Sequence, residues 1–419
     1  LLLSLEIIST HAEQFQDDTI PRESILENLL SLLSLPSKSK ISKEVFNTLC
    51  QNISITPLEC DLRLICKNLL SSSPFVKTTI LETLEEEFDL SQFFDIVPEV
   101  YILLFDAEQQ VSELARQVWE SNQLSITPHI FDTLVNEEHF GLSDAGLRSF
   151  TGKSYASAVF LLASNIASGE SETTVTQDDI VSLAINKLIL AYEDKSVALT
   201  DIVDKNGFVI TPASKRKDPW EMRSSIAIAL FELVNILISL ESFDPKENII
   251  DLIVFFTNSG CLGDINDLVR DEYKDAGVKL MTELGKDYVE DIIPIFEDAL
   301  TREITPLPAG KKATSPSENG LIIQENIIVL YGSLAQHLDS DDHRIASIVA
   351  RLLDALTSPS ENVHKAVAKI IAPLVPKFSD EVGQFISNLF VQLFYPMPPA
   401  FVRKVANCEI GRALVRERG

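Results

Sequence analysis

Residues 329–376 read VLYGSLAQHLDSDDHRIASIVARLLDALTSPSENVHKAVAKIIAPLVP, and this stretch decides the fold. Its apolar residues recur at i, i+3, i+4 and i+7, the spacing that places them on one face of a helix. Two polar breaks interrupt the pattern, the acidic turn LDSDDH at residues 338–343 and the turn SPS at residues 358–360. The stretch therefore predicts amphipathic helices in succession, separated by short turns.

The same pattern runs through almost the whole chain of 419 residues. Helical segments of about 12 to 20 residues alternate with short breaks that carry Pro, Ser, Asp or Asn. Prolines fall at or near the expected helix starts, where the missing N–H costs nothing; they are Pro21, Pro57, Pro74, Pro98, Pro128, Pro245, Pro294 and Pro359. Apolar runs such as residues 249–256 (IIDLIVFF) continue a helical stripe, so we predict buried helices there rather than strands.

A second regularity relates successive helices to one another. Several helices open with Asp or Pro, continue with a branched apolar residue or Met beside Arg, His or Gln, and then carry Ala; they open at Asp106, Asp218, Asp264, Pro359 and Pro398. Met222 and Val269, like Val363 and Val402, stand about 40 to 47 residues apart, which is the period of HEAT repeats. We expect the Asp to cap the second helix of each pair and the Arg to bridge to the Asp of an adjoining repeat.

Each helix pair can bury its apolar face only against its neighbours. The predicted fold class is therefore all-α, an α-solenoid of HEAT-type antiparallel helix pairs that forms a curved superhelix. We predict one array over residues 1–302, a flexible inter-repeat loop over residues 303–320 and a continued array over residues 321–419, incomplete at both ends. Residues 168–179 and 201–218 are predicted as further breaks, the second with a turn at residues 206–207 (Asn-Gly).

The formal net charge of −27 favours solubility and opposes non-specific binding to nucleic acid or anionic membrane. Acidic outer faces also keep solenoids monodisperse without any further role. The most apolar run, residues 226–240, carries Glu232 and Asn235 and is shorter than a membrane span, so we predict a buried helix. No targeting signal is visible, and a cytoplasmic location is expected.

The cysteines predict a reduced, intracellular compartment. The chain has five cysteines, and no two of them have the spacing of zinc ligands: Cys50, Cys60, Cys66, Cys261 and Cys408. We expect buried structural thiols. Trp119 falls on an apolar stripe and is predicted to lie in the core, whereas Trp220 is predicted to pack at a junction between helices rather than to face a partner.

Motifs for catalysis are missing from the sequence. Gly152, Lys153 and Ser154 resemble the tail of a phosphate-binding loop, but the first glycine is out of position and no strand precedes it. The six histidines show no metal spacing, and carboxylate runs such as residues 85–87 are expected to be solvated. We therefore predict no enzyme, with no catalytic, cofactor-binding or metal-binding residue, no cofactor and no small-molecule substrate.

A few basic islands oppose the general acidity. The candidate residues for contact with a ribosome or another partner are Lys215, Arg216, Lys217, Lys311, Lys312, Arg403, Lys404, Arg412, Arg416 and Arg418. Such residues can neutralise RNA phosphates. They can equally offset helix dipoles at helix ends, and the sequence leaves both alternatives open.

Residues 105–119 (FDAEQQVSELARQVW), residues 218–233 (DPWEMRSSIAIALFEL) and residues 329–376 resemble the middle region of one family of giant HEAT-repeat proteins. These are the ribosome-associated general-control translational activators. Residues 269–285 and 403–419 fit further repeats of the same family. The resemblance extends from about residue 105 onward and lies in the residues of the repeat framework, so it indicates ancestry rather than a site.

The resemblance implies that the parent protein binds translating ribosomes, particularly stalled or collided ones. With an ATP-binding-cassette partner, it would help to activate the kinase that phosphorylates the alpha subunit of initiation factor two during amino-acid starvation. The kinase-binding region and the part that is similar to elongation factor three are expected downstream of this sequence. Our hypothesis is a non-catalytic scaffold segment with no membrane partner. The alternative is another HEAT-repeat adaptor, such as a nuclear transport receptor or a cytoskeletal binding array.

Overall fold

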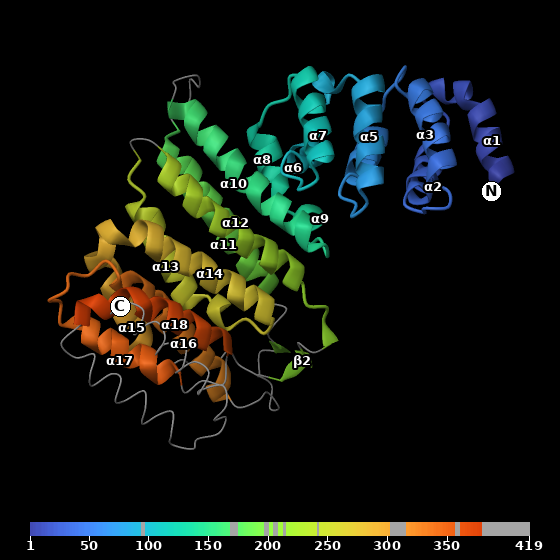
Figure 1. Cartoon of the computed structure of the whole chain (residues 1–419). Helices are drawn as coiled ribbons and strands as arrows, with labels where there is room; N and C mark the ends of the chain where they lie inside the picture. Colours follow the sequence, from blue (N-terminus) through green and yellow to red (C-terminus); the bar gives the residue numbers. More distant parts are fainter. Residues whose placement is uncertain are drawn as a thin grey trace. The chain divides into compact units, whose positions relative to one another are not determined.

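The computed structural model describes residues 1–93, 97–167, 175–196, 201–203, 208–212, 215–240, 243–301, 316–356 and 361–378. These residues are almost entirely helical, as predicted (Figure 1). The chain divides into two compact units, Leu1–Ile180 and Val181–Gly419, so the division falls inside the stretch predicted as one array, residues 1–302.

The first unit is a double row of helices. Its helices are α1 (Leu2–Thr10), α2 (Glu23–Leu33), α3 (Ser39–Ile53), α4 (Glu59–Lys67), α5 (Pro74–Glu87), α6 (Pro98–Leu103), α7 (Gln109–Ser121), α8 (Pro128–Leu134), α9 (Glu137–Phe140) and α10 (Ala145–Ala167), with 3₁₀ turns η1 (Ala12–Gln16) and η2 (Leu90–Gln92). Helices α3, α5 and α7 lie side by side in one row (Figure 1), and α2, α4 and α6 pack in the other. Consecutive helices thus form antiparallel pairs, as a solenoid requires.

One hydrophobic cluster runs without a break through the first helices of this unit, from Leu5 to Leu124. In α7 the buried residues are Val111, Ala115 and Val118, which is the predicted helical spacing. Trp119 packs against the cluster, and its ring centroid lies 5.1 Å from that of Tyr101. The core is therefore continuous from pair to pair, as expected for stacked repeats.

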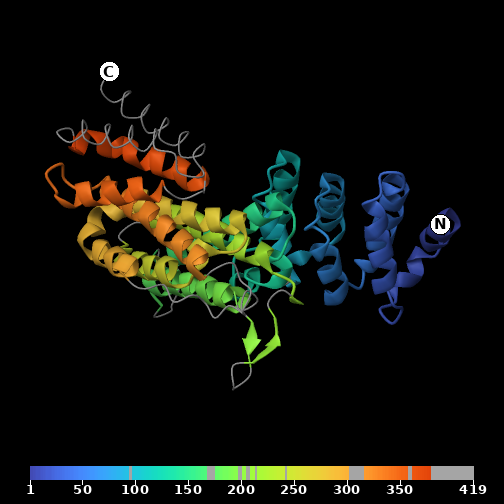
Figure 2. The same ribbon diagram turned by 90° about the horizontal axis from the view of Figure 1, so that it is seen from below.

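The second unit repeats this arrangement. Its helices are α11 (Gln177–Ser196), which begins just before the division, α12 (Trp220–Ser239), α13 (Lys246–Asn258), α14 (Asp267–Leu284), α15 (Val289–Thr301), α16 (Pro316–Ala335), α17 (Arg344–Ala355) and α18 (Glu361–Leu374), with 3₁₀ turns η6 (Cys261–Gly263), η7 (Gly285–Tyr288) and η8 (Val375–Phe378). Helices α12, α14, α16 and α18 form one row, and α13 packs on α15 in the other (Figures 1 and 2). The predicted buried helix at residues 249–256 is α13.

Helix α12 is long and apolar enough to cross a membrane by length and composition alone, with a mean hydropathy of 1.6. It extends further than the apolar run predicted from residue 226, because it begins at Trp220. Of its most apolar window, 61% is buried inside the protein against its neighbours. Helix α12 is therefore a core helix of the second unit, as predicted.

Two short strands occur within residues 201–218, which the sequence predicts only as a break with a turn. Strand β1 (Ile202–Val203) pairs antiparallel with β2 (Val209–Thr211); Ile202 lies opposite Thr211 and Val203 opposite Val209. The register shifts between Ile202 and Val203, so the ribbon is irregular. Residues 206–207 lie outside the described residues.

Several predicted boundaries differ from the structure. Helix α16 begins at Pro316, so the loop predicted over residues 303–320 ends earlier, because a proline in the first turn starts a helix well. Residues 302–315 and Pro359 lie outside the described residues. Pro294 lies inside α15 rather than at its start, because η7 leads directly into this helix. Helix α11 begins at Gln177, inside the break predicted at residues 168–179.

The predicted aspartate caps are also corrected. The N-cap of α14 is Asn266, whose side chain accepts hydrogen bonds from the backbone N–H groups of Leu268 and Val269. Asp264 instead binds Arg223 of α12 in the adjoining helix pair, which confirms the predicted bridge. Asp106 likewise pairs with the Nζ of Lys77 on α5, at 2.6 Å. These carboxylates neutralise buried cations, and a charge without a partner would be costly in the core.

Candidate interaction surface

A short ribbon between α11 and α12 carries exposed apolar and basic side chains. We name as the hairpin surface Phe208, Val209, Ile210, Lys215 and Lys217. Phe208 is 72% exposed, Val209 44% and Ile210 65%. Figure 2 shows the two strands projecting from the helices of the second unit. This is the most exposed run of consecutive large apolar residues among the described residues after the N-terminal Leu1, Leu2 and Leu3.

The local sequence explains the ribbon. Every residue of β1 and β2 is Val, Ile or Thr, and these β-branched residues favour extended backbone. Successive residues of a strand point to opposite faces. Among the described residues no second layer buries this ribbon, so side chains on both of its faces are accessible, including Phe208, Val209 and Ile210.

The basic residues follow the ribbon directly. Lys215 and Lys217 are exposed and Arg216 is half-buried, and the backbone N–H of Lys215 donates to the carbonyl of Pro212. These three are the predicted contact residues that the structure describes. The others lie outside the described residues: Lys311, Lys312, Arg403, Lys404, Arg412, Arg416 and Arg418.

A buried ion-pair network anchors the chain at the end of this basic run. Arg223 donates through Nη1 to Asp218 Oδ1 at 2.5 Å, and through Nε and Nη2 to the two carboxylate oxygens of Asp264. Burial alone would lower the pKa of Arg223, but the two carboxylates outweigh it and raise that pKa. Arg223 therefore stays charged and fixes the start of α12, where Trp220 is half-buried in the first turn.

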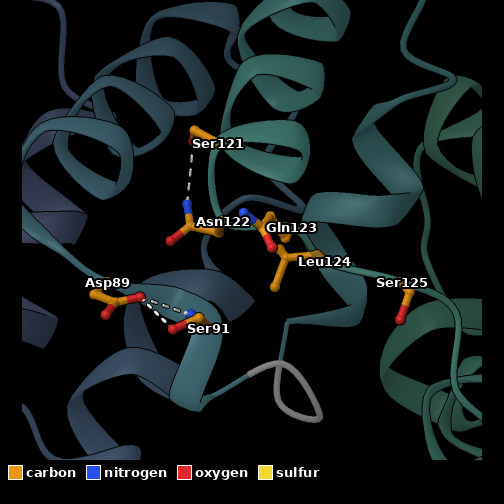
Figure 3. A pocket seen from close by; sticks show the side chains of 7 residues that line it. All are labelled: Asp89, Ser91, Ser121, Asn122, Gln123, Leu124 and Ser125. Carbon is orange, nitrogen blue, oxygen red and sulfur yellow. Dashed lines mark hydrogen bonds between the residues drawn. The ribbon is translucent and has the colours of Figure 1, made fainter.

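Two hollows among the described residues are open to solvent and lined largely by polar side chains. The first has a volume of about 490 Å³ and is lined by Asp89, Ser91, Ser121, Asn122, Gln123, Leu124 and Ser125 (Figure 3). The Asp89 carboxylate accepts hydrogen bonds from the N–H and the hydroxyl of Ser91, and these bonds lower the pKa of Asp89. An exposed carboxylate with a lowered pKa is a poor general acid or base at neutral pH. The second hollow lies between α1 and α3.

Buried titratable groups elsewhere hold helices together. His139 Nδ1 lies 3.0 Å from the carbonyl of Thr133, and its Nε2 lies 3.1 Å from Glu99 Oε1, which joins α9 to α6. Arg22 pairs with Asp61 in the same way between α2 and α4. Among the described residues, no group of three or more His, Cys, Asp or Glu side chains could hold a metal ion. These pairs are inter-helix contacts of the framework.

Two smaller predictions can be compared with the structure. Gly152, Lys153 and Ser154 lie inside α10, so they form part of a helix and not a phosphate-binding loop. Cys50, Cys66 and Cys261 are buried free thiols, as predicted. Cys60 is exposed, which corrects the prediction; it follows Glu59 at the start of α4 and points away from the apolar face that Leu62 and Ile65 bury. Cys408 lies outside the described residues.

The sequence reasoning missed the apolar half of the hairpin surface. The sequence pattern predicts only a break with a turn at Asn-Gly over the stretch that contains Phe208, Val209 and Ile210. Two β-branched runs on either side of Asn-Gly are the signal for a hairpin. Their exposure followed only from the structure, because the pattern does not show whether another layer covers a ribbon.

The stacked helix pairs and the core that they share define a class of protein, the α-solenoids. Residues 87–336 match a family model described as "Stalled ribosome sensor GCN1, HEAT repeats". The chain belongs to this GCN1 family of HEAT-repeat proteins.

Curated relatives agree with this family. The chain is 41% identical to the eIF-2-alpha kinase activator GCN1 of Saccharomyces cerevisiae over 408 residues, which cover 97% of the chain and 14% of the yeast protein. It is 26% identical to the human stalled ribosome sensor GCN1 over 90% of the chain and 13% of that protein. Protein ILITYHIA of Arabidopsis thaliana is 24% identical over 79% of the chain and 10% of its own length. The chain thus spans a small part of its relatives.

Proposed function

We propose that this chain is a non-catalytic scaffold segment of a cytoplasmic, ribosome-binding translational activator. It holds the ribosome-contacting and the kinase-contacting regions of the parent protein at a set distance and curvature. The parent protein, with an ATP-binding-cassette partner, helps to activate the kinase that phosphorylates eIF2α under amino-acid starvation or when ribosomes stall or collide. Membership of the family over residues 87–336 carries the proposal, and the names of the yeast and human relatives support it.

The packing within each unit supports a role in spacing. A solenoid is stiff when neighbouring pairs share a core and are linked by contacts that cannot slide. In the second unit, Arg223 and Asp264 form such a contact between adjoining pairs, and Arg344 reaches Glu290 across another pair with two hydrogen bonds. These contacts support a stiff packing of the helix pairs in the second unit.

The charge distribution supports ribosome contact at a few places only. A net charge of −27 repels the phosphates of RNA over most of the surface. Lys215 and Lys217 are exposed beside a projecting ribbon. We assign contact with the ribosome first to these residues, and then to the basic residues at 311–312 and after 403 that the sequence predicts.

The experiment uses the full-length parent protein in cells starved for an amino acid. One variant lacks this chain, and a second carries in its place an equal number of HEAT helix pairs with an unrelated surface, except that residues 201–218, 303–320 and 403–419 are retained. The expected result is that excision removes starvation-induced eIF2α phosphorylation and that the replacement restores most of it. Immunoblots would verify that both variants accumulate like the wild type.

Two results would contradict the proposal. Normal phosphorylation after excision would show that no spacing by this chain is needed. Failure of the replacement to restore any phosphorylation, with the variant present at the normal level, would show that the chain acts through its own surface and not as a spacer. Co-sedimentation with polysomes would show separately whether each variant still binds ribosomes.

A further inference from the structure

The hairpin surface has an apolar centre. Single exposed apolar residues are common on proteins, but a contiguous group on a projecting element marks a contact site. Phe208, Val209 and Ile210 are consecutive, and none of the three is buried by the helices of the second unit. Figure 2 shows the ribbon standing away from those helices. Leaving this group in water costs free energy that a partner would recover.

The surface also has a basic edge. Lys215 and Lys217 follow the ribbon within a few residues and are exposed, in a chain whose net charge is −27. An apolar centre with a charged edge is the usual composition of a protein–protein interface. The edge of the partner must be acidic to complement the two lysines.

A nucleic acid fits this surface less well. The ring of Phe208 could stack on a base, but Val209 and Ile210 beside it have neither a ring nor a side-chain donor that could bind one. Only the lysines could engage phosphates, and binding of that kind leaves the apolar centre uncovered. The apolar residues therefore favour a protein partner.

We infer that the hairpin surface docks on a folded protein that presents an apolar hollow edged by Asp and Glu side chains. The inference rests on the proposed function in one respect, because it takes the ribosome as the particle that carries this partner. Contact made here then goes to a ribosomal protein and not to ribosomal RNA. The apolar residues supply most of the affinity, and the lysines orient the approach.

The test measures binding of the full-length parent protein to purified ribosomes across a series of salt concentrations. One variant combines Phe208→Ser with Ile210→Ser, which removes the apolar centre and keeps every charge. A second combines Lys215→Ser with Lys217→Ser. The control combines Ile265→Ser with Leu268→Ser, because these residues are exposed to a similar degree, 59% and 46%, at the start of α14.

We expect the apolar variant to bind at least tenfold more weakly at every salt concentration, which matches the loss of a central apolar anchor. The lysine variant should bind only a few-fold more weakly, and mainly at low salt, because salt screens exposed charges. The control should bind like the wild type. All the altered side chains are exposed, so thermal unfolding should be unchanged, which separates lost docking from lost folding.

Several outcomes would overturn the inference. Loss of binding in the lysine variant alone, with a steep dependence on salt, would mean contact with RNA phosphates. Normal binding by both variants would mean that the hairpin surface is not used. A photo-crosslinking residue at position 210 adds an independent readout. A crosslinked product that becomes smaller on ribonuclease treatment, or a product with a second copy of the same protein, would also overturn the inference. The excision experiment on eIF2α phosphorylation judges the scaffold proposal separately from each of these results.

Discussion

The side chains of Arg223 and Asp264 meet through two parallel hydrogen bonds, 2.8 Å from Nε to Oδ2 and 3.0 Å from Nη2 to Oδ1, and neither side chain is exposed. The two residues are 41 positions apart, about one repeat. Arg22 and Asp61 form a related contact 39 positions apart in the first unit, at 3.0 Å. Buried ion pairs at the repeat distance thus link adjoining helix pairs in both units.

Replacing Arg223 by Ala should destabilise the second unit by about 3–5 kcal/mol, because it leaves the buried Asp264 carboxylate without its cationic partner. Chemical denaturation measures the change in the free energy of unfolding. The matched control is Arg63→Ala, which breaks an exposed pair with Glu59 and should cost about 0.5 kcal/mol or less. A double variant, Arg223→Met with Asp264→Leu, should recover much of the loss. A cost for Arg223→Ala as small as that of the control would show that the pair does not hold the unit together.

Gln123 should gain stability when it is replaced by Gly. Its φ of 51° lies in the left-handed region, directly after α7, where glycine is the usual residue. The substitution should raise the free energy of unfolding of the first unit by about 1 kcal/mol. Gly260 has a φ of 79°, so Gly260→Ala is the reverse experiment and should lower stability by a similar amount. If Gln123→Gly and Gly260→Ala changed the free energy of unfolding in the same direction, backbone strain would not explain either effect.

Iodoacetamide should label the cysteines unequally. Burial raises the pKa of the thiols of Cys50 and Cys66, and it raises that of Cys261 to about 12, so all three hold their protons and are shielded from reagent. Cys60 is exposed and should be labelled in the native protein. Peptide mapping by mass spectrometry locates the label, and a denatured sample is the control in which all cysteines react. Native labelling of Cys66 as fast as Cys60 would contradict the packing of α4.

The second unit should lose stability on acidification partly through Arg344. Its guanidinium donates hydrogen bonds that lower the pKa of both Glu290 and Asp342. Because the folded-state pKa values lie below the unfolded ones, the pairs stabilise the fold above about pH 4.5, and this stabilisation is lost as pH falls through the folded values. The variant Arg344→Met should show a smaller fall in the thermal midpoint between about pH 5 and pH 3.

The control for that experiment is Arg351→Met. Arg351 lies on the same helix, α17, and has no ion pair among the described residues. Its acid dependence should equal that of the wild type. An unchanged acid dependence in the Arg344 variant would show that Glu290 and Asp342 titrate alike in the folded and unfolded protein.

The helices and their order were predictable because they depend on neighbours a few residues apart. The spacing of Val111, Ala115 and Val118 fixes the buried face of α7 before any partner helix is known. Prolines such as Pro74, Pro98 and Pro128 occupy the first helical positions that the sequence assigns to them. The repeat distance and the resemblance then pointed to stacked pairs and to the family that the comparisons identify.

The candidate surface was predictable only in part. The basic residues at 215–217 stand out in an acidic sequence, whereas the apolar residues beside them resemble any other apolar run. Whether Phe208 and Ile210 are covered depends on which helices lie nearby, and no local pattern records that.

Local patterns in the sequence predict most of the helices, the distance at which they repeat and an Arg that meets an Asp of an adjoining repeat. Only the tertiary structure decided that Asp264 neutralises Arg223 instead of capping α14, and that Asp106 takes a lysine, Lys77, as its partner. The physical reason is the range of the interactions. Helix formation is set within a turn or two of the chain, but the partner of a buried charge is selected among residues a whole repeat away by the cost of leaving that charge unpaired.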